Sequence, residues 1–135
     1  MTPNRKTLGN PFLETLGVTL HSWREGYAEF HLPVRPMLGN GTGRVQGGVL
    51  CTLLDVAAAY CGLYSPEGAP SRMCVSLALT TNFLDSTVGE LLIAKGRVQR
   101  AGRSIFFSQA EVFMDDQFLL ASALGTFKYV PLIEH

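Results

Sequence analysis

An almost wholly apolar run from Val49 to Leu63, with Asp55 as its single charge, constrains the fold of this chain more than any other feature. We expect a helix over about Gly47 to Tyr64, with Gln46-Gly47-Gly48 at its start and Ser65-Pro66 as its stop. The run is too short to span a membrane. A helix that is apolar on nearly every side has to be covered by other elements, which predicts a sheet wrapped around it.

Alternation of apolar and polar residues predicts strands on both sides of this helix. Two strands precede it and four follow it: Leu16 to His21, Tyr27 to Leu32, Met73 to Leu84, Glu90 to Arg100, Arg103 to Met114 and Phe118 to Val130. The chain is expected to turn between them at Arg24-Glu25-Gly26 and then, in hairpins, at Asp85 to Gly89, Ala101-Gly102 and Asp115-Asp116. One face of the second strand holds Ala28, Phe30 and Leu32, and the other holds Tyr27, Glu29 and His31.

The remaining segments predict no regular structure. Met1 to Thr15 is expected to be an N-terminal arm, with a turn or extended chain at Asn10-Pro11. The glycine-rich segment from Met37 to Val45 is expected to be a loop. One long central helix wrapped by a curved antiparallel sheet of about six strands is an α+β fold, and its edge strands could pair in a dimer.

The composition predicts one domain over residues 1–135, because 47% of the residues are hydrophobic and 16% are charged. The formal net charge is zero and no basic cluster is present, so neither nucleic acid nor a membrane is an expected partner. Met1 to Asn10 is polar and lacks the apolar core of a signal sequence, which predicts a cytoplasmic protein.

Neither the cysteines nor the histidines predict a metal site. The chain has three cysteines, Cys51, Cys61 and Cys74. They are odd in number, lie in apolar segments and lack Cys-x-x-Cys spacing, so we expect buried free thiols in a reducing compartment. Zinc sites need tighter clustering than the scattered His21, His31 and His135 provide. His21 and His31 fall on strand faces, and neither is expected to be catalytic.

The predicted helix has two unlike sides. At 100° per residue, small residues surround Asp55: Gly48, Cys51, Thr52, Ala58, Ala59 and Gly62. The opposite side is expected to face the sheet and holds Leu50, Leu53, Ala57, Tyr60 and Tyr64. A carboxylate in apolar surroundings is costly to bury, so Asp55 has either a backbone donor or a chemical task. The glycines leave helix-start N–H groups uncovered at the positive end of the dipole, which favours a donor that polarises an electrophile.

Asn40, then Val45-Gln46-Gly47-Gly48-Val49-Leu50, then Leu53-Leu54-Asp55, resembles the signature of the hotdog-fold thioesterases of the PaaI (phenylacetic acid degradation) type. That family shows an Asn in the preceding loop, a His-Gly-Gly at the helix start and an acidic residue nine positions after the His. The similarity covers about Leu16 to Val130 in the family's element order. It continues through Ser76 to Leu79, Asn82 to Leu84, Val98 to Ser104 and Gly125 to Phe127.

This resemblance implies acyl-CoA thioester hydrolysis in a site shared between two subunits of a homodimer, or of a homotetramer built from two dimers. The Gly47 N–H would polarise the thioester carbonyl, and Asp55 from the partner subunit would be the general base or the nucleophile. Asn40 would orient the thioester or the water. Ser76 would hold the water opposite Asp55, or else is an ordinary strand serine. CoA would be part of the substrate, so no separate cofactor is expected.

Gln46 departs from the family's pattern, which has His at this position. Glutamine forms hydrogen bonds but carries no proton near neutral pH, so any role that requires imidazole is lost. Polarisation by the Gly47 amide would survive. The departure keeps a second function open, a non-hydrolytic module that binds or senses acyl-CoA. A hydratase or dehydratase on the same fold is a third possibility, disfavoured because the helix and its preceding loop contain no His.

The segment Arg100-Ala101-Gly102-Arg103-Ser104 has the chemistry to bind phosphate groups. It offers two guanidiniums beside a tight turn, backbone donors and a hydroxyl. The corresponding hairpin binds CoA in similar family members, so these five residues and Gly48 are the predicted CoA-binding residues. The alternative is a hairpin tip with two solvated arginines. Phe106, Phe107 and Phe113 are expected in the core rather than in an acyl-specific site.

Overall fold

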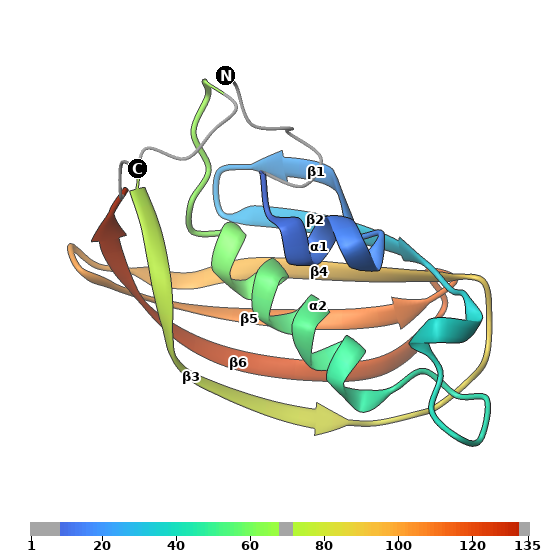
Figure 1. Ribbon diagram of the computed structural model, residues 1–135. Helices are drawn as coiled ribbons and strands as arrows, with labels where there is room; N and C mark the ends of the chain where they lie inside the picture. The colour runs from blue at the N-terminus through green and yellow to red at the C-terminus, as the bar shows by residue number, and fades with distance from the viewer. Residues whose placement is uncertain (1–8, 68–71, 133–135) are drawn as a thin grey trace.

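The computed structural model describes residues 9–67 and 72–132. One long helix lies against the concave face of a strongly curved antiparallel sheet of six strands (Figure 1). The elements are α1 (Pro11–Leu16), β1 (Thr19–Arg24), β2 (Tyr27–Pro33), the 3-10 helix η1 (Pro36–Leu38), α2 (Gly47–Tyr60), β3 (Arg72–Phe83), β4 (Leu91–Ala101), β5 (Ile105–Met114) and β6 (Phe118–Pro131). The predicted α+β hotdog fold is confirmed.

The strand order in the sheet is β1-β2-β4-β5-β6-β3. The predicted hairpin turns at Ala101-Gly102 and Asp115-Asp116 are confirmed, since they join β4 to β5 and β5 to β6. The hairpin predicted at Asp85 to Gly89 is wrong, because β3 pairs with β6 at one edge while β4 pairs with β2 and β5 in the middle. A turn-forming sequence marks the end of a strand, but packing over α2 selects the strand's partner.

The N-terminal segment is helical, not extended, where it is described. Asn10 caps α1, its side-chain oxygen accepting a hydrogen bond from the Leu13 amide at 3.1 Å. An Asn-Pro step favours a helix start as well as a turn, which explains the difference from the prediction. Because α1 ends at Gly17 with φ 91°, β1 begins three residues later than predicted, at Thr19. Residues 1–8 of the predicted arm lie outside the described residues.

Helix α2 ends at Tyr60, four residues before its predicted end. The Gly62 amide then donates to the Ala59 carbonyl, and the backbone leaves the helix in a tight turn. A Cβ on Gly62 would overlap the ring of Phe106 on β5. The chain therefore turns where only glycine fits against the sheet, and does so before it reaches Pro66.

The core lies between α2 and the concave face of the sheet. One of the two predicted faces of β2 is fully buried, the face with Ala28, Phe30 and Leu32. Four of the five helix residues predicted to face the sheet are buried: Leu50, Leu53, Ala57 and Tyr60. Ala58 is buried as well, so the side of small residues around Asp55 is narrower than predicted. Of the phenylalanines, Phe106 is buried, but Phe107 is 43% exposed and its predicted place in the core is wrong.

Backbone contact and hydrogen bonds fix α2 on the sheet. A Cβ on Gly96 of β4 would overlap the Ala57 carbonyl, so helix and strand backbones meet directly there. The Ser108 hydroxyl donates to the Ala58 carbonyl at 2.6 Å, and the Trp23 indole N–H donates to the Tyr60 carbonyl at 2.8 Å. Carbonyls near the end of the helix thus have partners, and the position of α2 along the sheet is specified. Within the described residues, no helix is long and apolar enough to cross a membrane.

Candidate active site

The start of α2 presents backbone donors. Gln46 is the N-cap residue and its side chain makes no capping hydrogen bond. Val49 and Leu50 both donate to the Gln46 carbonyl, at 3.0 and 3.4 Å. The amides of Gly47 and Gly48 have no acceptor among the described residues. They lie at the N-terminus of α2, which is the positive end of the helix dipole. This is the arrangement that stabilises a developing negative charge on a carbonyl oxygen.

The end of β3 forms an apolar wall beside these donors. A Cβ placed on Gly47 would lie 3.5 Å from the Phe83 ring, so the ring packs against the helix start. The Phe83 side chain is nevertheless 57% exposed. Phe83 was not among the predicted site residues, although it lies in the segment Asn82 to Leu84, which is part of the family resemblance.

Asp55 has a side-chain partner rather than a backbone donor. The Ser76 hydroxyl on β3 donates to Asp55 Oδ1 at 2.8 Å, within the same chain. Asp55 is half-buried and Ser76 is exposed. The pairing of β3 with β6 is irregular between Ser76 and Ala78, a bulge that changes the direction of side chains locally. The structure thus brings two predicted site residues into direct contact.

Cys74, which is half-buried near Asp55, is a poor nucleophile. Burial, with the Asp55 charge as a smaller cause, raises the pKa of the Cys74 thiol to about 12. Burial raises the pKa of the Cys61 thiol to about 12 as well. A protonated thiol does not attack a thioester at neutral pH. The chemistry near Asp55 therefore belongs to the carboxylate.

Asn40 organises the loop that precedes α2. Its Oδ1 accepts hydrogen bonds from the Thr42 amide (2.8 Å), the Thr42 hydroxyl (2.6 Å) and the Arg44 amide (3.2 Å). Arg44 in turn donates to the Ser86 carbonyl at 2.8 Å, which ties the loop to the β3–β4 connection. Oδ1 is committed to the turn, so any contact of Asn40 with substrate would use its Nδ2 group. An Asn before a glycine-rich turn is the signal that predicts such a structural bond.

The predicted CoA-binding turn is not next to Gly47 within one chain. Residues 100–104 form the exposed β4–β5 hairpin at the far end of α2. There the Gly102 amide donates to the Ile105 carbonyl, and the Tyr129 amide donates to the Ser104 carbonyl. The side chains of Arg100 and Arg103 are at the surface.

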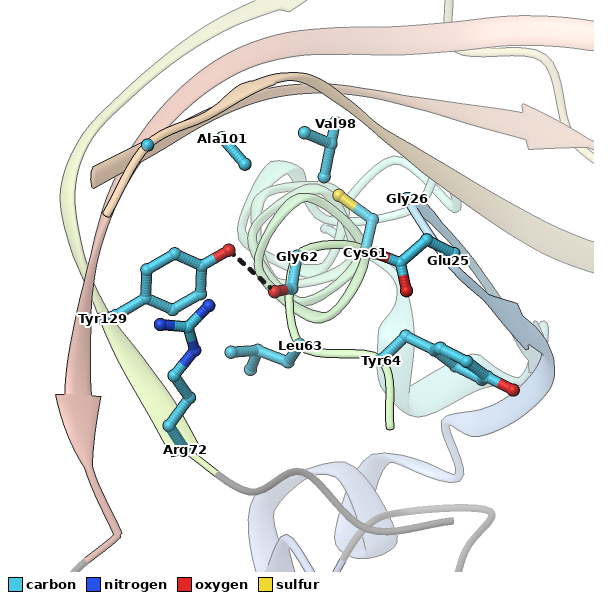
Figure 2. Close-up of a pocket in the computed structure, with 11 residues that line it drawn as sticks. Glu25, Gly26, Cys61, Gly62, Leu63, Tyr64, Arg72, Val98, Ala101 and Tyr129 are labelled. Carbon is cyan, nitrogen blue, oxygen red and sulfur yellow. Dashed lines mark hydrogen bonds between the residues drawn. The ribbon is translucent and has the colours of Figure 1, made fainter. Parts of the chain in front are cut away.

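A cavity of about 270 Å³ lies between this hairpin and the end of α2. Figure 2 shows the Tyr129 hydroxyl directed at the Gly62 carbonyl, a hydrogen bond of 3.0 Å, with Arg72 beside the tyrosine ring. The Arg72 guanidinium lies 3.4 Å from that ring's centre. No sequence pattern predicts this cavity, because its walls come from five separate segments.

The chain belongs to the thioesterase superfamily, whose family model matches residues 42–121. This stretch contains Gly47, Asp55 and Ser76. The protein is thus a thioester hydrolase, as predicted, and the resemblance to hotdog thioesterases of the PaaI type is confirmed.

Individual relatives share the fold or the sequence over most of this chain. The structure of the conserved protein PA5202 from Pseudomonas aeruginosa is 30% identical with a TM-score of 0.85, covering 95% of this chain and 100% of that one. The PaaI protein from the phenylacetic acid degradation operon of E. coli shares the fold, at 24% identity and TM-score 0.80 over 90% of this chain and 85% of that one. The medium/long-chain acyl-CoA thioesterase YigI of Escherichia coli (strain K12) is 28% identical over 131 residues, 87% of this chain and 84% of the relative.

Proposed function

We propose that this enzyme hydrolyses acyl-CoA or aryl-CoA thioesters to the free acid and CoA. The main support for this proposal is the placement of Asp55, whose carboxylate accepts a hydrogen bond from Ser76 on the open side of α2. The same helix begins with two amides that have no acceptor among the described residues. The name of the YigI relative, a medium/long-chain acyl-CoA thioesterase, supports a CoA ester as the substrate class.

Helix geometry supports a site shared between two subunits. Gly47 and Asp55 are eight residues apart in α2, which corresponds to about 12 Å along the axis at 1.5 Å per residue. The donor to a carbonyl and the base for its attacking water have to lie within a few ångströms of that carbonyl. In a homodimer whose two α2 helices run antiparallel, Gly47 would face the partner subunit's Asp55, and each dimer would have two sites.

Strand β3 is the edge that would join the subunits. Val75 and Leu77 on β3 are 47% and 55% exposed, although both are large and apolar. Pairing of two β3 strands would continue the sheet and cover these side chains. On the convex face Phe107 and Leu124 are 43% and 56% exposed, which would suit the packing of two dimers into a homotetramer.

The proposed reaction begins when the Gly47 amide polarises the thioester carbonyl. In the first mechanism, Asp55 takes a proton from water, the hydroxide adds to the carbonyl carbon, and the C–S bond breaks as the CoA thiolate leaves and is protonated. In the second, the Asp55 carboxylate adds to the carbonyl and expels the thiolate, and water then hydrolyses the resulting anhydride. In both, the Ser76 hydrogen bond to Oδ1 would direct Oδ2 toward the reacting atoms.

The neighbouring polar residues would position the substrate. Gln46 replaces the family's His and has no capping bond, so its amide group would contact the thioester without transferring a proton. Asn40 would contribute Nδ2. The exposed Arg100 and Arg103, with the hairpin around them, would bind CoA phosphates. Alanine at both arginines should raise KM for an acyl-CoA several-fold and leave kcat unchanged, as measured by thiol release at low and high salt.

Thiol release from a panel of acyl-CoAs of increasing chain length and aryl-CoAs tests the proposed activity. Asp55→Asn should lose at least about 100-fold in kcat, while Asp116→Asn, an exposed carboxylate on the β5–β6 turn, should match the parent. Equal hydrolysis by Asp55→Asn would exclude the mechanism. Turnover in H₂¹⁸O separates its two forms, because label in Asp55 itself requires the anhydride.

A second function is favoured by Gln46, which lacks the proton-carrying ability of His. In that case the chain would bind acyl-CoA without hydrolysing it. Calorimetry that shows tight binding of a CoA ester, together with no thiol release by the parent or by Gln46→His, would favour binding over hydrolysis. We also propose a cytoplasmic location for the single domain, since Cys51, Cys61 and Cys74 are free thiols.

A further inference from the structure

Three side chains that commonly bind metal ions converge on the convex face of the sheet, away from α2. They are His21 on β1, and Glu29 and His31 on β2. Each provides one ligand atom, and these three atoms lie within 4.8 Å of one another. Glu29 Oε2 is 2.7 Å from His31 Nε2 and 3.9 Å from His21 Nε2. Both imidazoles therefore direct a nitrogen at the same carboxylate oxygen.

A bulge in β1 places His21 in this group. Leu20 pairs with Phe30 and Ser22 pairs with Glu29, so His21 is the extra residue between two adjacent pairs. A bulged residue leaves the regular register and its side chain is redirected. Here the redirected imidazole stacks on His31, with ring centres 3.9 Å apart and planes at 10°. The pairing of β1 with β2 thus brings together histidines that are ten positions apart in the sequence.

The carboxylate of Glu29 is oriented from outside the group. The Tyr27 hydroxyl donates to Glu29 Oε1 at 2.6 Å, which leaves Oε2 facing the histidines. Partners of this kind, which hold a ligand in place through its second oxygen, are typical of metal sites. The Glu29 and His31 side chains are only 16% and 20% exposed.

Nearby cations have other partners. Lys95 is the register neighbour of Glu29 on β4, but its ammonium pairs with Asp116 at 2.9 Å. The guanidiniums of Arg24 and Arg97 lie over the Tyr27 ring, 3.9 and 4.8 Å from its centre. Within the part of the chain that the structure describes, Glu29 forms its ion pairs only with the two histidines.

We propose that His21, Glu29 and His31 form a binding site for a divalent transition-metal ion such as Zn²⁺. Tetrahedral Zn²⁺ with ligands at about 2.0–2.1 Å requires ligand atoms about 3.3–3.4 Å apart, and the observed 2.7 and 3.9 Å lie on either side of that value. Three protein ligands leave one position for water. Because the site lies across the sheet from α2, the ion does not take part in thioester hydrolysis. It connects β1 to β2 at the edge of the sheet.

Calorimetric titration of the tag-free, chelator-treated chain with Zn²⁺ tests this site. We expect one Zn²⁺ per chain with a Kd on the order of 10 µM, weakened at least about tenfold by either His21→Ala or Glu29→Gln. The matched control is His135→Ala, which removes the third histidine of the chain and lies outside the described residues. It should bind as the parent does. No heat of binding at 100 µM Zn²⁺, or equal binding by parent and His21→Ala, would overturn the proposal.

Thermal unfolding gives an independent readout. An ion that binds only the folded chain raises Tm, by about 5 °C at ten times Kd for a chain of this size. His21→Ala should abolish the shift, and because the His21 side chain is 57% exposed, this variant should fold normally without metal. A shift of equal size in parent and His21→Ala would place the Zn²⁺ elsewhere and contradict the assignment.

Discussion

The two edges of the sheet differ in length and in surface. Strand β1 has six residues, is bulged and carries a polar outer surface around His21. Strand β3 has twelve residues and exposes Val75, Leu77 and Phe83. A short edge strand with a polar surface discourages further pairing, whereas a long apolar edge favours the addition of another strand. This difference agrees with the proposal that two subunits pair through β3 rather than through β1.

The proposed active site lies beside the β3 edge and does not include the β1–β2 edge. Strand β3 holds Asp55 through Ser76, and its end packs Phe83 against Gly47. The β1–β2 edge holds the His21 and Glu29 group, on the opposite face of the sheet from α2. Changes on the β3 side should therefore affect both assembly and activity, whereas changes on the β1 side should affect only stability and metal binding.

The largest expected effect on activity comes from removing the Gly47 N–H, which lies beside the end of β3. Gly47→Pro deletes the backbone N–H, and proline is tolerated at the first helical position. The preceding Gln46 already has φ −62° and ψ 135°, which a following proline favours. We expect kcat for acyl-CoA hydrolysis to fall about 100- to 1000-fold with Tm nearly unchanged. Full activity of Gly47→Pro would show that the Gly47 amide is not the donor. The control is His21→Ala on β1, which should retain parent activity.

A charged β3 edge should break the assembly. Val75→Lys combined with Leu77→Lys would place like charges face to face if two β3 strands pair. Sedimentation should show dissociation to monomers, with at least about a tenfold loss of activity because Gly47 would lose the partner subunit's Asp55. His21→Lys on β1 is the matched control and should leave assembly intact. A fully active monomer would contradict the shared site.

Ser76→Ala should have a smaller effect on the same side of the molecule. A hydrogen bond to a charged group contributes about 1.5–3 kcal/mol, and its loss would leave Asp55 less well oriented. We expect kcat to fall about tenfold with KM little changed, and Ser76→Thr to restore part of the activity. If Ser76→Ala is as active as the parent in thiol release, the serine is only a strand residue.

The smallest expected effect is on the β1–β2 edge. Burial alone would raise the pKa of Glu29, but hydrogen bonds from Tyr27 and His31 outweigh it and hold that pKa below its usual 4.5. A depressed pKa contributes stability above pH 4.5 that is lost as the pH falls through the folded-state value. Urea unfolding at pH 7 and pH 3.5 should therefore show a weaker pH dependence for Glu29→Gln than for the parent. An identical pH dependence of the two free energies of unfolding would show that Glu29 does not contribute to it.

Local patterns predicted much of the fold. The almost wholly apolar run after Gly47-Gly48 predicted α2, the alternation in β2 predicted its two faces, and turn chemistry predicted the hairpins at 101–102 and 115–116. Errors arose where local signals are ambiguous. Asn10-Pro11 suits a helix start as well as a turn, and the end of α2 depends on Phe106, which lies far away in the sequence.

The sequence by itself determined the central helix, the protein's family and the spacing of Gly47 and Asp55. All three follow from residues that are close together in the chain. Tertiary structure alone decided that β3 pairs with β6, that Ser76 reaches Asp55 and that His21 meets His31. These contacts join residues distant in the chain or displaced by a bulge, and they depend on strand partners and register. Burial of α2 under one curved sheet selects those partners, and no local pattern encodes them.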